Sequence, residues 1–404
     1  MTLLKRVSHD LTMAVSRPMV RRRLVGVEGL EHLPLDGPCV LVSNHLSFAD
    51  HFVYEALVFA VRGEQAAFLT KAESFTGLRS TWFDSVGAVP VDRSRPAREV
   101  FEITDRVFGS GRVLVVYPEG TRNPRPPMLD FKDGGFRFAD RAQVPVIPAA
   151  LWGAQDVLPI GGRVPRSGRI RVVFGPPLLP DPELPRAARI RDLTERGRAA
   201  VGTLLERATE PLPPSAADMA ERTSALAETV LERGLSGLDT THPRIRRKQA
   251  ALLLRIARHL DPDNTAARTG TVRLRGLRAM DAPQPFKAFG MFQVRAAAQR
   301  LLREDADNLM AHYVMGRWHL LMPGVMGGRP DRAVEHLACA ERLGGTDSRY
   351  AMAHAEALLA AGRRAQAAAA LDRVIAAPVP DQRTRLRRER AVALRERDPD
   401  LSTV

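Results

Sequence analysis

The sequence predicts two architectures in one chain, an N-terminal α/β domain followed by an all-α, tetratricopeptide-like helical domain. From Leu24 to Leu179, short apolar runs alternate with longer amphipathic ones, which is typical of a domain with a largely parallel sheet. The run Pro211-Leu212-Pro213-Pro214 then interrupts the pattern. Beyond it strand-like runs disappear, and Ala, Leu and Arg recur at helical spacing.

Within the first half, short runs of mainly apolar residues are the predicted strands. They are Cys39–Val42, Ala67–Leu69, Ala88–Val91, Val113–Val116, Val146–Ala149 and Ile170–Phe174. Patterns of helical period around His51–Val61 and Arg98–Phe108 fall between them. Strands that alternate with helices in this way favour parallel pairing, because each helix carries the chain back to the same edge of the sheet.

The first 23 residues form a separate basic segment, residues 1–23. Leu4, Val7, Leu11 and Ala14 recur at helical spacing, and Pro18 is expected to close the helix. Two interpretations remain open. The segment is either an amphipathic helix that lies on anionic lipid, or an ordinary helix packed on the domain.

Composition limits the classes of function. The 404 residues carry a formal net charge of +14, which favours polyanions, anionic lipid or phosphorylated substrates as partners. Aromatic residues make up only 5% and no basic patch is interleaved with them, which argues against nucleic acid. With two cysteines and no long apolar span, we expect a cytoplasmic protein, peripheral on the inner face of the membrane.

The C-terminal half contains one internal repeat. The segment from Gly328 to Leu337 aligns with Gly362 to Leu371 at an offset of 34 positions, the tetratricopeptide period. The preceding helical patterns, Tyr313–Leu321 and Ala351–Leu359, align at an offset of 38 because the loop after the first is four residues longer. Pro243–Glu304 is expected to add more divergent helical pairs. A generic helical bundle is the alternative.

A polar motif follows the first predicted strand. It reads Asn44-His45-Leu46-Ser47-Phe48-Ala49-Asp50 and lies on the loop that leads into a helical pattern. Loops at strand ends commonly carry functional residues. A His and an Asp at this spacing are by themselves weak evidence for a site.

Three further blocks occur in order along the same half. They are Gly87-Ala88-Val89-Pro90-Val91-Asp92-Arg93, Val115-Val116-Tyr117-Pro118-Glu119-Gly120-Thr121-Arg122 and Val144-Pro145-Val146-Ile147-Pro148. Lesser matches are Lys71-Ala72-Glu73 and Phe131-Lys132-Asp133-Gly134. With the His motif, this set resembles the four conserved blocks of the lysophosphatidic acid acyltransferase family. The resemblance covers residues 26–179. Tyr117 stands where the family usually has Phe, and Asn123-Pro124 where it often has Ser-Arg.

The resemblance implies O-acyl transfer to a lysophospholipid in phospholipid biosynthesis. Asn44 and Thr121 favour the branch whose acceptor is 1-acyl-glycerol-3-phosphate. His45 is then the general base that takes the proton of the acceptor hydroxyl, and Asp50 holds its ring in one tautomer. The donor is acyl-CoA or acyl-ACP, a thioester that is already activated, so neither a cofactor nor a metal is expected.

Charge recognition falls to the other blocks. Arg122 is the candidate for gripping phosphate with a fork of two hydrogen bonds. Glu119 is expected to orient Arg122 or the loop, and Gly120 to allow close approach of the ligand. Arg93 and Lys71 are second candidates for the phosphate or for the phosphopantetheine of the donor.

The predicted organisation is a basic segment at residues 1–23, an acyltransferase domain at 24–210, a linker and connecting helix at 211–242 and a helical repeat-like domain at 243–404. The helical domain is expected to bind a protein partner. Three alternatives stay open: another lysolipid as acceptor, a glycolipid as acceptor, or a catalytically inactive interaction module.

Overall fold

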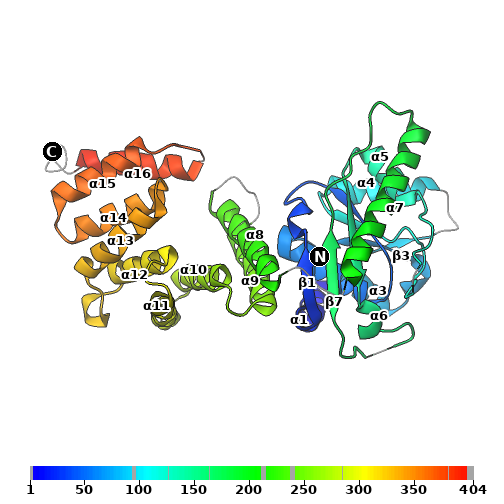
Figure 1. Ribbon diagram of the computed structural model, residues 1–404, viewed down its shortest axis with the longest axis horizontal. Coiled ribbons are helices and arrows are strands. Elements are labelled where there is room, and N and C mark those ends of the chain that lie inside the picture. The colour runs from blue at the N-terminus through cyan, green and yellow to red at the C-terminus, as the bar shows by residue number, and fades with distance from the viewer. Residues whose placement is uncertain are drawn as a thin grey trace. The chain divides into compact units, whose positions relative to one another are not determined.

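The computed structural model describes residues 3–92, 97–125, 127–162, 164–210, 215–236, 242–283, 285–380 and 382–397 (Figure 1). These residues form two compact units. The first contains Met1–Leu226 and Arg255–Asn264, and the second contains Ala227–Leu254 and Thr265–Val404. The linker segment 211–214 expected from the sequence lies outside the described residues.

A seven-stranded sheet forms the centre of the first unit, with strand order β1-β7-β6-β2-β5-β3-β4. Every strand predicted from the sequence is present, and β1 is an additional edge strand. The bounds are β1 Leu24–Glu28, β2 Cys39–Ser43, β3 Ala67–Lys71, β4 Ala88–Val91, β5 Val113–Val116, β6 Val146–Trp152 and β7 Ile170–Phe174.

The sheet is largely parallel, as predicted. β2 pairs in parallel with β5 and β6, and β3 pairs in parallel with β4 and β5. The exception is β7, which runs antiparallel to β6 and pairs in parallel with β1. The carboxyl ends of β2, β3, β5 and β6 therefore meet at one edge, where ligands of α/β domains bind.

Helices cover both faces of this sheet. One face packs α4 (Ala97–Gly109), α5 (Gly134–Ala142) and α7 (Arg186–Thr209) through a fully buried apolar cluster that includes Val40, Leu114 and Phe136. α7 lies along β6 and β7 (Figure 1). The remaining helices of this part are α2 Ala49–Arg62, α3 Leu78–Ser85 and α6 Ala154–Val157, with short 3-10 turns at Leu30–His32 and Ala72–Ser74.

The N-terminal helix α1 extends over Leu3–Arg23, so the prediction that Pro18 closes it is wrong. A proline inside a helix removes one backbone hydrogen bond and costs about 3 kcal/mol. Tertiary packing on both sides of Pro18 offsets that cost, because Met13 and Val20 are buried. α1 packs against α2 and α3.

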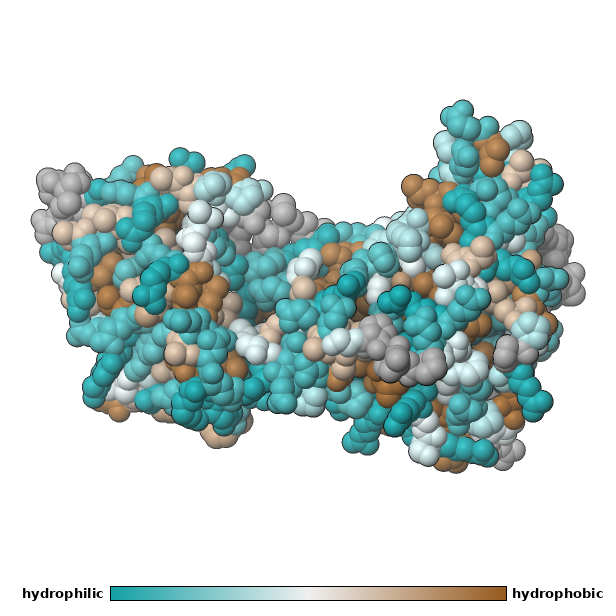
Figure 2. Space-filling view, in the orientation of Figure 1, coloured by the Kyte–Doolittle hydropathy of each residue, from teal (hydrophilic) through white to brown (hydrophobic). Residues whose placement is uncertain are grey.

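All regular structure described after residue 215 is helical, as the sequence predicts. Consecutive helices contact each other in turn from α10 to α16. They are α8 Ala216–Ser236, α9 Pro243–Leu260, α10 Thr265–Asp281, α11 Phe286–Glu304, α12 Leu309–Leu321, α13 Pro330–Gly344, α14 Ser348–Ala360, α15 Arg364–Ala376 and α16 Gln382–Arg397, with a 3-10 turn at Gly324–Met326. Most of the visible surface is hydrophilic, with apolar patches on both units (Figure 2).

The internal repeat falls on two helix pairs, α12/α13 and α14/α15. Equivalent positions of the repeat are buried in both copies. Ala333 and Leu337 in the first pair, and Ala367 and Leu371 in the second, are all completely buried in one apolar cluster. The aligned residues therefore have the same structural role.

Candidate active site

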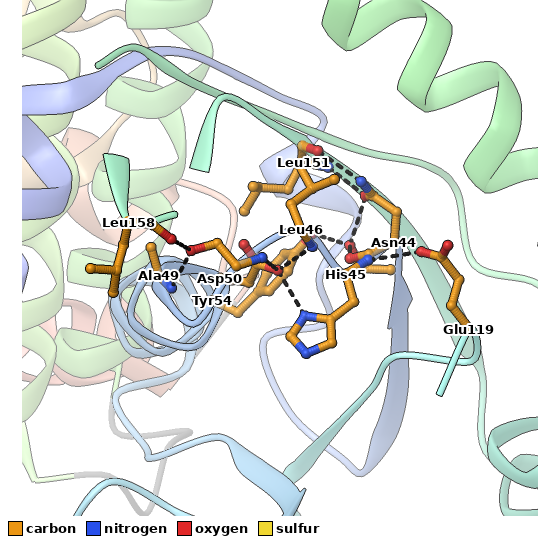
Figure 3. A network of polar contacts seen from close by, with 11 residues as sticks. Asn44, His45, Leu46, Ala49, Asp50, Tyr54, Glu119, Leu151 and Leu158 are labelled. Atoms are coloured by element: carbon orange, nitrogen blue, oxygen red, sulfur yellow. Dashed lines mark hydrogen bonds and ion pairs between the residues drawn. The ribbon is translucent and has the colours of Figure 1, made fainter. Parts of the chain in front are cut away.

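His45 and Asp50 lie together at the carboxyl edge of the sheet. His45 follows β2 directly, and Asp50 lies in the first turn of α2. The imidazole Nδ1 is 2.9 Å from Asp50 Oδ2 (Figure 3). The His45 side chain is 22% exposed, whereas the Asp50 side chain is completely buried. One partner can therefore reach a substrate while the other supports it from behind.

Asp50 is held by the backbone of the loop that precedes it. Its Oδ2 also accepts hydrogen bonds from Leu46 N at 2.7 Å and Ser47 N at 3.0 Å. With His45 Nδ1, three nitrogen atoms thus lie within hydrogen-bond distance of this one oxygen. Because a carboxylate only accepts, the His45 proton lies on Nδ1, and Nε2 is left with its lone pair free to receive a proton.

The rest of the motif anchors this loop to the sheet and to the loop that follows α6. Asn44 Nδ2 donates to Leu151 O, and Leu151 N donates back to Asn44 Oδ1, both at 2.9 Å (Figure 3). Ser47 Oγ donates to Leu158 O at 2.5 Å and accepts from Ala49 N at 3.0 Å. The polar residues around His45 and Asp50 thus fix the position of the pair.

Tyr117, at the end of β5, stacks on the His45 ring. The ring centroids are 4.0 Å apart and the planes differ by 12°. The Tyr117 hydroxyl is buried and has no hydrogen-bond partner among the described residues. Burial, followed by the Asp50 carboxylate, raises the pKa of Tyr117 well above its ordinary value. The hydroxyl therefore stays protonated, and the ring limits the orientation of His45.

Glu119 contacts the loop that carries His45. Its Oε1 accepts from His45 N at 3.0 Å (Figure 3). Its Oε2 accepts from Asn123 Nδ2 at 3.0 Å and Leu129 N at 2.9 Å. Asn123 N also donates to His45 O at 2.6 Å. Glu119 thus joins the loop after β5 to the loop that carries His45. Asn123, which departs from the family pattern, bonds to both Glu119 and His45.

A cavity of about 470 Å³ lies beside His45. Lys71, Gly120, Thr121 and Arg122 line it together with His45. The structure therefore brings five of the predicted site residues to one cavity, with Asp50 and Glu119 behind it. Arg93 lies outside the described residues.

Apolar side chains also line the cavity. They include Phe48, Phe68 and Val116, with His51 beside them. His51 Nε2 lies 2.9 Å from Val86 O, and its ring lies 3.8 Å from that of Phe68. Burial lowers the pKa of His51 to about 4, so this second imidazole is neutral at physiological pH. The lining of the cavity therefore includes both cationic and apolar side chains.

Lys132 is a further cationic residue near this site that the sequence did not single out. Gly120 has a φ of +74°, and a Cβ at that position would lie 2.8 Å from Lys132 Nζ. Lys132 N also donates to Pro118 O at 2.9 Å. The absence of a side chain at Gly120 lets the ammonium lie directly above the backbone that leads to Arg122. The sequence signal for Lys132 is the block Phe131-Lys132-Asp133-Gly134, one of the lesser matches to the family.

Comparison with known proteins identifies the family of this domain. Residues 24–152 match the family model described as Acyltransferase. The 1-acyl-sn-glycerol-3-phosphate acyltransferase BAT2, chloroplastic, of Brassica napus is 33% identical over 157 residues, which cover 38% of this chain and 44% of that protein. The 1-acyl-sn-glycerol-3-phosphate acyltransferase of Pseudomonas aeruginosa is 31% identical over 177 residues, covering 43% of this chain and 65% of that protein.

A solved structure is also similar, the crystal structure of the 1-acyl-sn-glycerophosphate (LPA) acyltransferase PlsC from Thermotoga maritima. It is 24% identical, covers 48% of this chain and 80% of that chain, and has a TM-score of 0.37. The part of the chain that matches spans less than half the length of the Brassica napus relative. Residues 24–152 of the N-terminal α/β domain thus match the Acyltransferase family model, and the relatives named above are 1-acyl-sn-glycerol-3-phosphate acyltransferases.

Proposed function

We propose that this protein transfers a fatty acyl chain from a thioester, acyl-CoA or acyl-ACP, to the free hydroxyl of 1-acyl-glycerol-3-phosphate. The observation that carries the proposal is the pair of His45 and Asp50 beside a cavity whose lining includes both cationic and apolar side chains. The names of the relatives support the acceptor.

The geometry supports a reaction without a covalent enzyme intermediate. As the acceptor oxygen attacks the thioester carbonyl carbon, His45 Nε2 takes the hydroxyl proton. The carbon–sulfur bond breaks, and the thiolate leaves with the proton returned by the imidazolium. Asp50 stabilises the imidazolium between these two transfers, as the aspartate does in a serine protease triad.

The acceptor phosphate is assigned to the cationic residues at and beside the cavity. Arg122 is exposed to solvent and can offer a planar fork of donors to a phosphate. Lys132 adds a second positive charge above Gly120, and Lys71 a third at the end of β3. The apolar wall of Phe48, Phe68 and Val116 is assigned to an acyl chain.

The same domain is proposed to contact the membrane surface through α1. Leu4, Val7, Leu11 and Val15 are between 55% and 67% exposed and lie on one stripe of the helix. The last turn carries Arg21, Arg22 and Arg23. An exposed apolar stripe on a basic helix suits the interface of an anionic bilayer on its cytoplasmic side. No helix within the described ranges is long and apolar enough to cross a membrane.

The helical unit has a different proposed role. The pairs α12/α13 and α14/α15 are proposed to be tetratricopeptide-like repeats, supported by the repeat in sequence and by the equal burial of its aligned positions. Such stacked pairs commonly bind proteins.

Product analysis tests the proposed reaction. The purified chain is incubated with palmitoyl-CoA or palmitoyl-ACP and with each of three acceptors: 1-acyl-glycerol-3-phosphate, its dephosphorylated monoacylglycerol, and a lysophospholipid with a choline headgroup. Mass spectrometry of the lipids should show phosphatidate as the main product. Preferential acylation of the dephosphorylated acceptor would contradict the phosphate assignment, and no product from any acceptor would contradict acyl transfer.

A further inference from the structure

A second cavity, of about 250 Å³, lies within the helical unit. Its lining comes from α10, α11, α12 and α14. The buried side chains of Met291, Val294 and Trp318 form its apolar floor. Met280 and Leu321 line it as well and are 46% and 44% exposed, so they form a rim that a ligand would cover.

Most residues that line the cavity come from α10, α12 and α14. α10 contacts α12, α12 contacts α14, and α14 contacts α16, in addition to the contacts between consecutive helices. Helices that alternate along the chain therefore stack side by side. In helical repeat proteins, such a layer provides the extended surface that binds other polypeptides.

The polar groups of the cavity wall are mostly hydrogen-bond donors. Arg273, Arg317 and Arg349 line it together with Tyr313, and its lining includes no Asp or Glu. Trp318 Nε1 is buried and has no hydrogen-bond partner in the described part of the chain. Because that atom has almost no accessible surface, the donors that a ligand in the cavity can meet are those of the lining arginines and Tyr313.

Carboxylates that do not line the cavity hold the three guanidinium groups in place. Arg317 pairs with Glu356, and Arg273 pairs with Glu228 and Glu232. These ion pairs fix the side chains before a ligand arrives, so less rotamer entropy is lost when one binds.

Arg349 is held in the same way, because its Nη2 lies 3.0 Å from Glu232 and 3.2 Å from Asp347. Its buried Nε has no hydrogen-bond partner among the residues that the structure describes. A guanidinium has five N–H donors, so the ion pairs of Arg317 and Arg349 use only some of them.

We propose that this cavity binds an acidic polypeptide segment, in which an apolar side chain enters the floor and neighbouring Asp or Glu side chains meet the arginines. The apolar floor and the size of the cavity fit one large aliphatic or aromatic side chain. The donor-rich wall selects carboxylates over basic groups, and the layer of stacked helices provides room for the rest of the segment. The proposal concerns the helical unit and does not depend on acyl transfer.

Selection from a random peptide library tests this assignment on the full-length chain. The immobilised protein is expected to enrich peptides with Asp or Glu beside Leu, Met or Phe. A synthetic peptide of the enriched sequence should then bind more weakly as salt is raised. In a chain that carries Trp82→Phe and Trp152→Phe, the fluorescence of Trp318 should change when this peptide binds.

Two variants connect binding to the cavity. Arg317→Glu should weaken binding of the enriched peptide at least about tenfold, since it places like charges together. Met280→Glu on the exposed rim should weaken it as well without breaking an ion pair. Arg332→Glu is the matched control, because Arg332 is an exposed arginine of α13 outside the cavity, and it should leave affinity within about twofold. Melting curves confirm that each variant is folded.

Three outcomes would overturn the proposal. The first is enrichment of basic or uncharged peptides, or no enrichment at all. The second is equal affinity of the enriched peptide for the wild type and for both cavity variants. The third is binding of phosphatidylglycerol vesicles that Met280→Glu abolishes while no peptide is enriched, which would assign the cavity to a lipid headgroup.

Discussion

At the scale of single residues, the proposed reaction depends on the lone pair of His45 Nε2. The bond from Nδ1 to Asp50 Oδ2 fixes this tautomer. His45→Ala should lower kcat by about 100- to 10,000-fold while the protein stays folded. Asp50→Asn should have nearly the same effect, because the amide allows the wrong tautomer. Steady-state rates and melting curves measure both, and a folded His45→Ala chain with wild-type kcat would contradict the mechanism.

Tyr117 allows a second test at this scale. Tyr117→Phe keeps the ring stacked on His45 and removes a buried hydroxyl without a partner among the described residues. We expect the free energy of unfolding to rise by about 1 kcal/mol and kcat to stay within a few fold. Tyr117→Ala should instead lose both stability and activity. A large loss of kcat in Tyr117→Phe would show that the hydroxyl contributes to the reaction.

At the scale of elements, the membrane contact depends on the exposed stripe of α1. Replacing both Leu4 and Leu11 by Ser should weaken binding to vesicles that contain phosphatidylglycerol by about tenfold or more, because each change removes most of an apolar side chain from the interface. Co-sedimentation measures this binding. Val20→Ala is the control, since Val20 is buried and belongs to the packed face. Unchanged vesicle binding of the double variant would exclude α1 as the contact.

A histidine pair joins α12 to α13 and predicts how stability depends on pH. His312 Nδ1 lies 3.0 Å from His336 Nδ1. Burial, then His312 and His319, lowers the pKa of His336 to about 4, and the nearby Glu335 carboxylate opposes this shift. The folded state thus disfavours the proton that the His336 side chain of the unfolded chain binds below pH 6.5. The contribution of His336 to the free energy of unfolding is fully present above that pH and is lost as the pH falls toward 4.

The loss should be on the order of 1 to 3 kcal/mol between pH 7 and pH 4, since one pKa unit corresponds to about 1.4 kcal/mol. Urea unfolding at a series of pH values measures it, and His336→Gln should reduce the slope. The prediction fails if His336→Gln and the wild type lose stability equally over this range.

The sequence predicted most elements of the first unit because its central strands are buried on both faces and therefore read as short apolar runs. The edge strand β1 was missed because Val25 is exposed and Gly26 interrupts the run. The end of α1 was misplaced because local propensity at Pro18 yielded to tertiary packing.

In the candidate site, too, contacts between distant segments could not be predicted from the sequence. The motifs pointed to His45 and Asp50, but the stacking of Tyr117 and the position of Lys132 above Gly120 depend on contacts between separate segments. No spacing in the sequence encodes those contacts. Glu119 is buried and accepts from His45 N, and its role in orienting the loop stays a prediction.

At the scale of the whole molecule, the two compact units divide inside helices. The first unit includes the beginning of α8 and the end of α9, although both elements lie beyond the prolines at 211–214. A boundary within a continuous amphipathic helix causes no change in composition, which is why the sequence could not show it.

This division predicts the result of truncation. Met219, in α8, is 2% exposed, and its side chain lies beside Gly26 of β1. A methyl group added at Gly26 would be 3.6 Å from Met219 Sδ. Arg222 reaches Glu31 at 3.4 Å. A chain that ends at Glu210 lacks these contacts and exposes the apolar surface beside β1, so it should melt about 5 °C or more below a chain that ends at Asn264.

The chain that ends at Asn264 is the matched comparison, because it keeps both pieces of α8 and α9 that belong to the first unit. We expect it to retain acyl transfer to dispersed acceptor, since every residue lining the cavity at His45 lies before α8. Differential scanning calorimetry and the product assay distinguish the possibilities. Equal melting temperatures for the two truncated chains would show that the folding unit ends before α8, and loss of activity in both would show that catalysis requires the helical unit.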